Sequence, residues 1–396
     1  MISEPEISIA GRVEGRRFAI RLGIFYAAMF GLAGAHLPFF PVWLKAVGID
    51  AVWIGVILAV PALTRFTVLP FVTALAERRQ SLRPALIVTA LLTALGFVVL
   101  GWAREATVIF LVFAVTACVW TPILPLTDAY ALQGVERYRL NYGPLRLWGS
   151  AAFVLGTLGC GLLVDQVAGE HLIWIMTGLA VLGAAVSSVL RPLVFPRATS
   201  PIRSGAGGLL RQPAFLVLVV SAALIQGSHA AYYGFASIAW QTAGFSGATI
   251  AGLWALGVLA EIVVFALSPR FILAPATLVM IGALGGVLRW LVTAQDPSLP
   301  VLVVVQLTHA LTYGVTLLGT MSLLARIVPG RIMASAQGYL SACSGIVMSG
   351  ASVLSGWMYA PYGYGIYYLM MAMAASGGGA MWLTRHRFDR DRNPAA

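Results

Sequence analysis

Five charged side chains and one histidine lie inside or at the edge of long apolar runs of this 396-residue chain. They are Arg65, Asp128, Arg146, Glu261, Arg289 and His309. An ionised group in an apolar surrounding costs several kcal/mol unless it is paired or hydrated. Side chains of this kind therefore either form structural ion pairs, or bind a charged solute and exchange protons.

Glu261 and Arg65 each lie about twelve or thirteen residues into an apolar run. At about 1.5 Å per residue, both are expected near the middle of a membrane-spanning helix. Glu261 is either a buried acid paired with Arg289 for packing specificity or a proton carrier, because burial favours a neutral carboxyl group whereas a neighbouring guanidinium favours the carboxylate. His309 either tunes these groups or is a hydrogen-bonded packing residue.

Asp128 lies late in one apolar run and Arg146 opens the next. The two form either a structural pair close to the membrane surface or part of a solute site. The three arginines of the set outnumber its two acids by one. If Arg65 and Arg146 both face one cavity, an anionic substrate would neutralise this excess, so a carboxylate is favoured over a neutral solute.

The segment Gly34–Phe40 is echoed 193 positions later by Gly227–Tyr233, and both read Gly-small-His-x-x-aromatic-aromatic. A repeat at about half the chain length is typical of a transporter built from two duplicated bundles. The paired histidines, His36 and His229, are either helix–helix hydrogen-bonding groups or substrate contacts.

Aromatic side chains accompany these positions. Tyr232 and Tyr233 follow His229, and Trp148 follows Arg146 by two residues. Such rings either pack against lipid and neighbouring helices or line the solute site. Because residues i and i+2 do not share a helix face, Trp148 is expected to pack while Arg146 points inward.

The composition indicates an integral membrane protein. The chain is 60% hydrophobic and 10% charged, with a mean hydropathy of +0.89, whereas soluble domains carry about 25% charged residues. Met1–Arg17 is polar and acidic in places, so we expect no signal peptide and a retained first span. Cys118, Cys160 and Cys343 lie in apolar runs without metal-ligand spacing, and are expected to be packing residues.

The net charge of +11 would suit a nucleic-acid-binding protein. Most of the basic residues, however, lie in short links between apolar runs, which is a topology signal. No convergent set of catalytic side chains stands out, so we do not expect an enzyme. The expected partners are a lipid bilayer, a small-molecule substrate and protons, with no nucleic acid, cofactor or metal.

Apolar runs of about 20 residues predict twelve spans. Their limits are 18–44, 52–75, 84–102, 107–132, 145–163, 172–192, 214–241, 249–268, 272–292, 299–324, 336–359 and 366–383. Twelve spans divide the basic residues other than Arg65 and Arg289 21 to 2 between the two sides of the membrane, which places both termini in the cytoplasm of a cell (inner) membrane protein. We expect an all-α fold with two six-helix bundles, 1–192 and 214–396, joined by a cytoplasmic linker, 193–213.

Four stretches of the chain resemble a known family. They are Pro38–Pro41 (PFFP), Leu124–Tyr130 (LPLTDAY), Tyr142–Ser150 (YGPLRLWGS) and His229–Phe235 (HAAYYGF). Through them the whole chain resembles a major facilitator superfamily transporter. Within that superfamily it is similar to the phenylpropionate-permease-like group, relatives of the lactose and nucleoside proton symporters. The resemblance implies two pseudo-symmetric six-helix bundles that work by alternating access.

The resemblance also implies roles for residues of the first half. The superfamily carries a gating loop after its second span, with Gly and then an Asp-Arg pair. Here Glu77 and Arg78 stand in place of that pair, and the leading Gly is absent. Asp128 and Arg146 resemble the acid and the arginine that bind sugar in lactose permease.

In the second half, Glu261, Arg289 and His309 resemble the residues that serve binding and proton coupling in lactose permease. Lactose permease has a further acid three residues after that histidine, where this chain has Thr312. This departure makes Glu261 the expected proton carrier.

Together these observations predict a proton symporter that imports a small aromatic carboxylate such as phenylpropionate. A proton symporter for a sugar or nucleoside is the main alternative, because an Asp/Arg pair also suits hydroxyl-rich solutes, and a drug-efflux pump is a third. The substrate is expected between the two halves of the protein.

Overall fold

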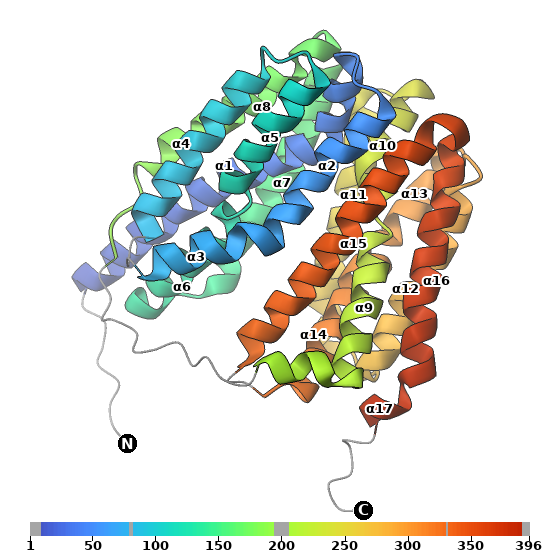
Figure 1. Cartoon of the computed structure of the whole chain (residues 1–396). Coiled ribbons are helices and arrows are strands. Elements are labelled where there is room, and N and C mark those ends of the chain that lie inside the picture. Colours follow the sequence, from blue (N-terminus) through green and yellow to red (C-terminus); the bar gives the residue numbers. More distant parts are fainter. Residues whose placement is uncertain (1–8, 79–81, 194–205, 330–331, 390–396) are drawn as a thin grey trace, which may run out of the picture. The chain divides into compact units, whose positions relative to one another are not determined.

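The computed structural model describes residues 9–78, 82–193, 206–329 and 332–389, and every regular element in these ranges is helical (Figure 1). Ten helical stretches are long and apolar enough to span a membrane, and the bent pair α2 (Ala51–Thr67) and α3 forms an eleventh. The longest stretch, Met333–Thr384, holds two helices, α15 and α16. When α15 and α16 are taken separately, a helix or a pair of helices lies at each of the twelve predicted spans.

Contacts divide the chain into two compact units, which are described separately. The first unit comprises residues 1–47 and 67–199, and the second comprises 48–66 and 200–396. Helix α2 therefore groups with the second unit, although it lies in the first half of the sequence. Of the predicted linker 193–213, residues 194–205 lie outside the described residues, and Ala206–Arg211 form a short 3-10 helix.

The helices of the first unit follow the predicted spans closely. They are α1 (Ile9–Ala46), α3 (Leu69–Arg78), α4 (Leu82–Leu100), α5 (Ala106–Trp120), α6 (Ile123–Tyr138), α7 (Tyr142–Val164) and α8 (Leu172–Ser187). The single span predicted at 107–132 is broken at Thr121–Pro122. Proline lacks a backbone N–H and so cannot continue the ladder of helical hydrogen bonds, which accounts for this break.

Close packing of α1 against α7 holds the first unit together. A Cβ atom at Gly34 would lie 2.1 Å from the backbone oxygen of Phe153, and one at Gly156 would lie 2.3 Å from that of Gly31. The hydroxyl of Thr157 donates a hydrogen bond of 2.8 Å to the Gly34 carbonyl. Small residues let the two backbones approach, as is common between membrane helices.

The second unit contains α2 and the helices of the second half of the chain. These are α9 (Pro213–Gly227), α10 (Ala230–Thr242), α11 (Gly247–Leu267), α12 (Pro275–Thr293), α13 (Leu299–Leu307), α14 (Thr316–Ile327), α15 (Met333–Tyr362), α16 (Ile366–Thr384) and α17 (His386–Asp389). The seventh predicted span is broken at Ser228–His229, between α9 and α10. The tenth is interrupted by the π-helical turn Ala310–Val315.

Helix α2 is attached to α15 by small residues and one hydrogen bond. A Cβ atom at Gly55 would lie 2.5 Å from the backbone oxygen of Ser352 and 2.8 Å from the Cα of Gly356. The hydroxyl of Ser349 donates to the carbonyl of Ala59 at 3.0 Å. This contact carries Arg65, near the end of α2, into the second unit.

Large apolar side chains remain exposed along the outer faces of many spans. Val115 on α5, Leu155 on α7 and Val304 on α13 are each more than half exposed. Water would be a poor solvent for so many such groups, whereas the acyl chains of a bilayer solvate them at no cost. The molecule is therefore a multi-pass membrane protein.

Candidate functional site

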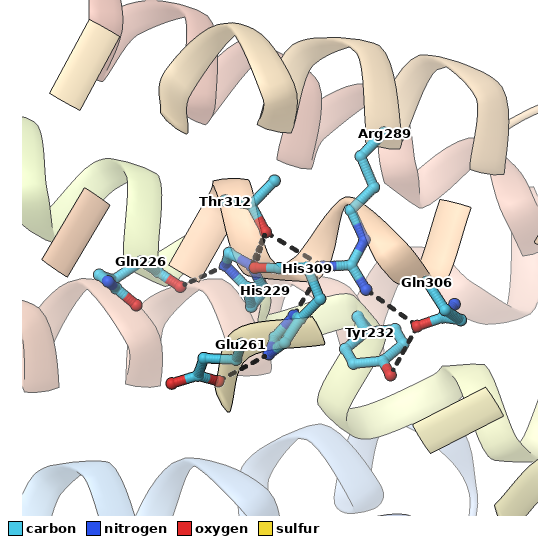
Figure 2. Close-up of polar contacts among 8 residues, drawn as sticks. All are labelled: Gln226, His229, Tyr232, Glu261, Arg289, Gln306, His309 and Thr312. Carbon is cyan, nitrogen blue, oxygen red and sulfur yellow. Dashed lines mark hydrogen bonds and ion pairs between the residues drawn. The ribbon is translucent and has the colours of Figure 1, made fainter. Parts of the chain in front are cut away.

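Eight polar residues of the second unit form one connected cluster, and they come from six helical segments and the junctions between them (Figure 2). They are Gln226, His229, Tyr232, Glu261, Arg289, Gln306, His309 and Thr312. The breaks in two spans position part of this cluster. His229 lies at the break between α9 and α10, and His309 immediately precedes the π-helical turn that holds Thr312. Turns of this type are frequent at functional sites.

Arg289 on α12 is the centre of the cluster, and its side chain is only 1% exposed. Its Nη1 lies 2.8 Å from Nδ1 of His309 and donates to Oγ1 of Thr312 at 3.1 Å. Its Nη2 donates to Oε1 of Gln306 at 3.1 Å. The guanidinium also lies 4.7 Å from the ring centre of Tyr232, a cation–π distance.

Glu261 on α11 reaches this cation only through an imidazole. Its Oε2 lies 3.7 Å from Nε2 of His309, and its side chain is 18% exposed. Among the described residues, the imidazole of His309 is the basic group within 4 Å of the Glu261 carboxylate, so the direct pair with Arg289 considered from the sequence is not formed. Gly314 packs beside the acid, since a Cβ there would lie 3.3 Å from Cγ of Glu261.

His229 is fully buried, and both of its ring nitrogens have partners. Nδ1 lies 3.1 Å from the backbone oxygen of Gln226, and Nε2 lies 2.9 Å from Oγ1 of Thr312. Of the two roles considered from the sequence, this geometry matches hydrogen bonding between helices. Thr312, at the position where the resemblance led us to look for an acid, instead joins His229 to Arg289.

The other predicted residues of the second unit border the cluster. Tyr232 donates to Oε1 of Gln306 at 3.0 Å. Tyr233 is stacked on His229, with ring centres 5.8 Å apart. The exposed side chain of Arg65 acts electrostatically on Tyr313, whose ring is stacked on His309 at 5.6 Å.

A second polar cluster lies in the first unit, around Asp128 on α6. One carboxylate oxygen, Oδ1, accepts hydrogen bonds from Tyr26 at 2.5 Å and from Tyr142 at 2.9 Å. The Nε of Arg146 lies 3.7 Å from the same oxygen. Asp128 and Arg146 remain about one-third exposed.

Aromatic rings cover one side of the Arg146 guanidinium. Its central carbon lies 4.3 Å from the ring centre of Phe30 and 5.9 Å from that of Tyr26. Trp148, by contrast, is 62% exposed and its ring lies against Gly23 of α1. Trp148 and Arg146 thus have different surroundings, and the expectation that Trp148 packs while Arg146 points inward stays a prediction.

His36 does not join either polar cluster. It is buried within the first unit among aromatic rings, with ring centres 4.5 Å from both Phe40 and Trp120. Its Nε2 has no hydrogen-bond partner among the described residues. The predicted gating residues Glu77 and Arg78 end α3, and the loop that follows, residues 79–81, lies outside the described residues.

Neutral polar residues of both clusters were missed as site residues from the sequence. The hydroxyls of Tyr26 and Tyr142 donate to Asp128, and the side chain of Gln306 accepts from Arg289. Gln226 contributes only its backbone oxygen, which accepts from His229. A weak signal was present for Gln306, because it lies three residues before His309, about one helical turn away. No comparable signal marked the tyrosines.

A twelve-span helical protein with two polar clusters inside its bundles has the architecture of a secondary transporter. A model of the MFS_1 like family matches residues 19–370, so the chain belongs to this family of the major facilitator superfamily. It is 34% identical over 362 residues to a probable 3-phenylpropionic acid transporter of Escherichia coli (strain K12), covering 89% of this chain and 94% of that protein. It is 25% identical over 365 residues to the maltose permease of Geobacillus stearothermophilus, covering 90% of this chain and 91% of that permease.

Solved structures share the fold. The nucleoside transporter NupG superposes with a TM-score of 0.78 at 15% identity, covering 95% of this chain and 99% of that chain. A bacterial homologue of the human lysosomal transporter Spinster superposes with a TM-score of 0.74 at 14% identity, covering 98% of this chain and all of that chain. The predicted fold is thereby confirmed, and the protein is a secondary transporter of the major facilitator type and not an enzyme.

Proposed function

We propose that the protein is a proton-coupled symporter that imports a small aromatic carboxylate, of the phenylpropionate type, by alternating access. It would act in the cell (inner) membrane with both termini in the cytoplasm, as the distribution of arginines predicts. In this proposal the Asp128–Arg146 cluster binds the substrate and the Glu261 cluster binds the proton.

The substrate assignment rests on the contacts of the Arg146 guanidinium. Its Nε faces Asp128, while Nη1 and Nη2 have no hydrogen-bond partner among the described residues. These two groups form the fork that binds a carboxylate bidentately. The rings of Phe30 and Tyr26 beside the guanidinium offer a surface for an aromatic substrate ring. The name of the relative that is 34% identical supports the same substrate class.

Glu261 supports the proton-coupling assignment. It is a largely buried acid whose described partner is an imidazole and not a cation. A carboxyl group in such a place can exist in both protonation states, because neither is locked by a direct ion pair. Proton binding on one side of the membrane and release on the other would couple the proton gradient to substrate movement.

A sugar or nucleoside is the second candidate substrate. The remaining oxygen of Asp128, Oδ2, has no partner among the described residues and is able to accept hydrogen bonds from hydroxyl groups. The similarity to a maltose permease favours the same possibility.

Uptake into proteoliposomes of known orientation tests the proposal. With a proton gradient imposed, we expect accumulation of 3-phenylpropionate, no accumulation of its neutral amide, and strong loss of uptake in Arg146→Gln. Equal uptake of acid and amide would exclude the carboxylate assignment, and accumulation of maltose or a nucleoside instead would select the second candidate. Substrate movement against the inward proton flow would identify an efflux pump.

The proton assignment has its own test. Glu261→Gln keeps the size and hydrogen-bonding capacity of the side chain but cannot titrate. We expect this variant to lose uphill uptake while keeping exchange of labelled for unlabelled substrate. A variant that still concentrates substrate would refute the role of Glu261.

A further inference from the structure

Arg289 is the donor in all of its side-chain hydrogen bonds. Its contact with His309 therefore determines which ring nitrogen of His309 carries the hydrogen. A guanidinium has only donors, so Nδ1 of His309, at 2.8 Å from Nη1, must be the acceptor. In a neutral imidazole the other nitrogen then carries the hydrogen. Nε2–H of His309 therefore points toward Oε2 of Glu261, 3.7 Å away.

The donors and acceptors around His229 assign it the opposite tautomer, with the hydrogen on Nδ1. The backbone oxygen of Gln226 only accepts, so Nδ1 of His229 is the donor in that contact. Because His229 is fully buried close to the Arg289 cation, a second positive charge there is strongly disfavoured, and the ring is neutral. Its Nε2 must then accept the hydrogen bond from the hydroxyl of Thr312.

Thr312 contacts both His229 and Arg289, and Arg289 in turn contacts His309. Its hydroxyl donates to His229 and its oxygen accepts from Nη1 of Arg289. The hydroxyl has one alternative acceptor, the backbone oxygen of His309 at 3.2 Å, which is the longer contact. With His229 in place, the chain of donors runs from Arg289 through Thr312 and His229 to the Gln226 carbonyl. The guanidinium is thereby held where its other N–H reaches His309 (Figure 2).

We propose that Thr312 and His229 are positioning residues that orient Arg289 so that His309 is held as a neutral N–H donor facing Glu261. This inference rests on the proposed function of Glu261 as the proton site. While Nδ1 of His309 accepts from Arg289 and Nε2 carries a hydrogen, the imidazole has no free site for another proton. Glu261 is then the group of this cluster that binds the transported proton.

The surroundings of His309 are consistent with a neutral ring. The charged groups that face it are Arg289 from α12 and Glu261 from α11. The other titratable groups against it are His229, Tyr232 and Tyr313, whose ring centres lie 5.5, 6.1 and 5.6 Å away. Arg65 of α2 acts from beyond Tyr313. The cation in direct contact opposes a positive charge on the imidazole, and Glu261 is too distant for a full hydrogen bond that would reverse this.

Nitrogen-15 NMR of histidine-labelled protein in bilayers reads the tautomers directly, with signals assigned by single-histidine replacements. At neutral pH we expect His309 to carry its hydrogen on Nε2 and His229 to carry its hydrogen on Nδ1. The opposite tautomer at either ring, or a doubly protonated His309, would overturn the inference. This measurement does not depend on transport, so it stands even if the proposed substrate or coupling is wrong.

A matched pair of Thr312 variants tests the positioning role. Thr312→Val keeps the shape of the side chain but removes the hydroxyl, whereas Thr312→Ser keeps the hydroxyl. We expect the Val variant to lose about tenfold in proton-driven accumulation, to keep substrate exchange, and to show a mixture of His309 tautomers, while the Ser variant retains the wild-type tautomer and most of the accumulation. Unchanged accumulation and an unchanged His309 spectrum in Thr312→Val would refute the role of this hydroxyl.

Discussion

Replacing His309 by Gln or by Leu separates hydrogen bonding from proton carrying. The imidazole accepts from Arg289 through Nδ1 and faces Glu261 with Nε2. A glutamine amide carries an oxygen acceptor and an NH2 donor on the same carbon. Its oxygen is able to accept from Arg289 while its NH2 group faces Glu261, as the imidazole does. The glutamine amide cannot titrate near neutral pH. Leucine fills a similar volume but can neither form these hydrogen bonds nor titrate.

The contacts of Arg289 set the size of the effect. Three hydrogen bonds from its guanidinium reach His309, Thr312 and Gln306, and its Nε already lacks a partner among the described residues. A hydrogen bond to a charged group is worth about 1.5–3 kcal/mol, and a buried donor left unpaired costs a similar amount. We therefore expect His309→Leu to lower the free energy of unfolding by about 1.5–3 kcal/mol. His309→Gln is expected to change it by less than about 1 kcal/mol.

Transport measurements then decide the role of His309. In proteoliposomes with an inward proton gradient, His309→Gln is expected to accumulate substrate within about threefold of the wild-type level. His309→Leu is expected to accumulate at least about tenfold less, because leucine neither accepts from Arg289 nor donates toward Glu261. Exchange of labelled substrate serves as the control for folding and binding. If the Gln variant exchanges normally but cannot accumulate, then His309 itself must take up the proton, and the assignment to Glu261 alone is wrong.

Two further predictions concern the first unit. Gly34→Ala is expected to lower the melting temperature in detergent clearly, because the new Cβ would lie 2.1 Å from the Phe153 oxygen. Gly159→Ala is the control and should have little effect, because nothing lies within 4 Å of its Cβ. Equal melting temperatures of the two variants would contradict the packing of α1 on α7. Tyr26→Phe removes the 2.5 Å hydrogen bond to Asp128 and is expected to weaken substrate binding about tenfold in a ligand-binding titration; unchanged affinity would exclude a role for Tyr26 in positioning that carboxylate.

The positions of the spans were predictable because apolar run length is a strong signal. The run 299–324 corresponds to Leu299–Ile327, and 366–383 corresponds to Ile366–Thr384. The breaks inside spans were not predicted, although Pro122 is a sequence signal for the one between α5 and α6. The interruption at Ser228–His229 and the π-helical turn at Ala310–Val315 leave the apolar run intact, so hydropathy does not register them.

Among the residues of the two polar clusters, those that carry a charge were the easiest to find in the sequence. Burying an ion in a membrane protein is costly, so Asp128, Arg146, Glu261 and Arg289 stand out in the sequence. Their partners do not stand out, because a tyrosine or glutamine in an apolar helix costs much less. Which groups touch is also a matter of helix packing across long sequence distances: Tyr26 and Asp128 are 102 residues apart and share a 2.5 Å hydrogen bond.

The two histidines of the internal repeat show how duplication and function diverge. His36 lies within the unbroken helix α1, and its Nε2 is enclosed by aromatic rings without a partner among the described residues. His229 occupies the corresponding place, but α9 ends just before it, so the Gln226 carbonyl accepts from its ring and orients it toward Thr312. The break between α9 and α10 thus coincides with a histidine that is linked to the Arg289 cation through Thr312, whereas the unbroken helix α1 carries a histidine packed among rings.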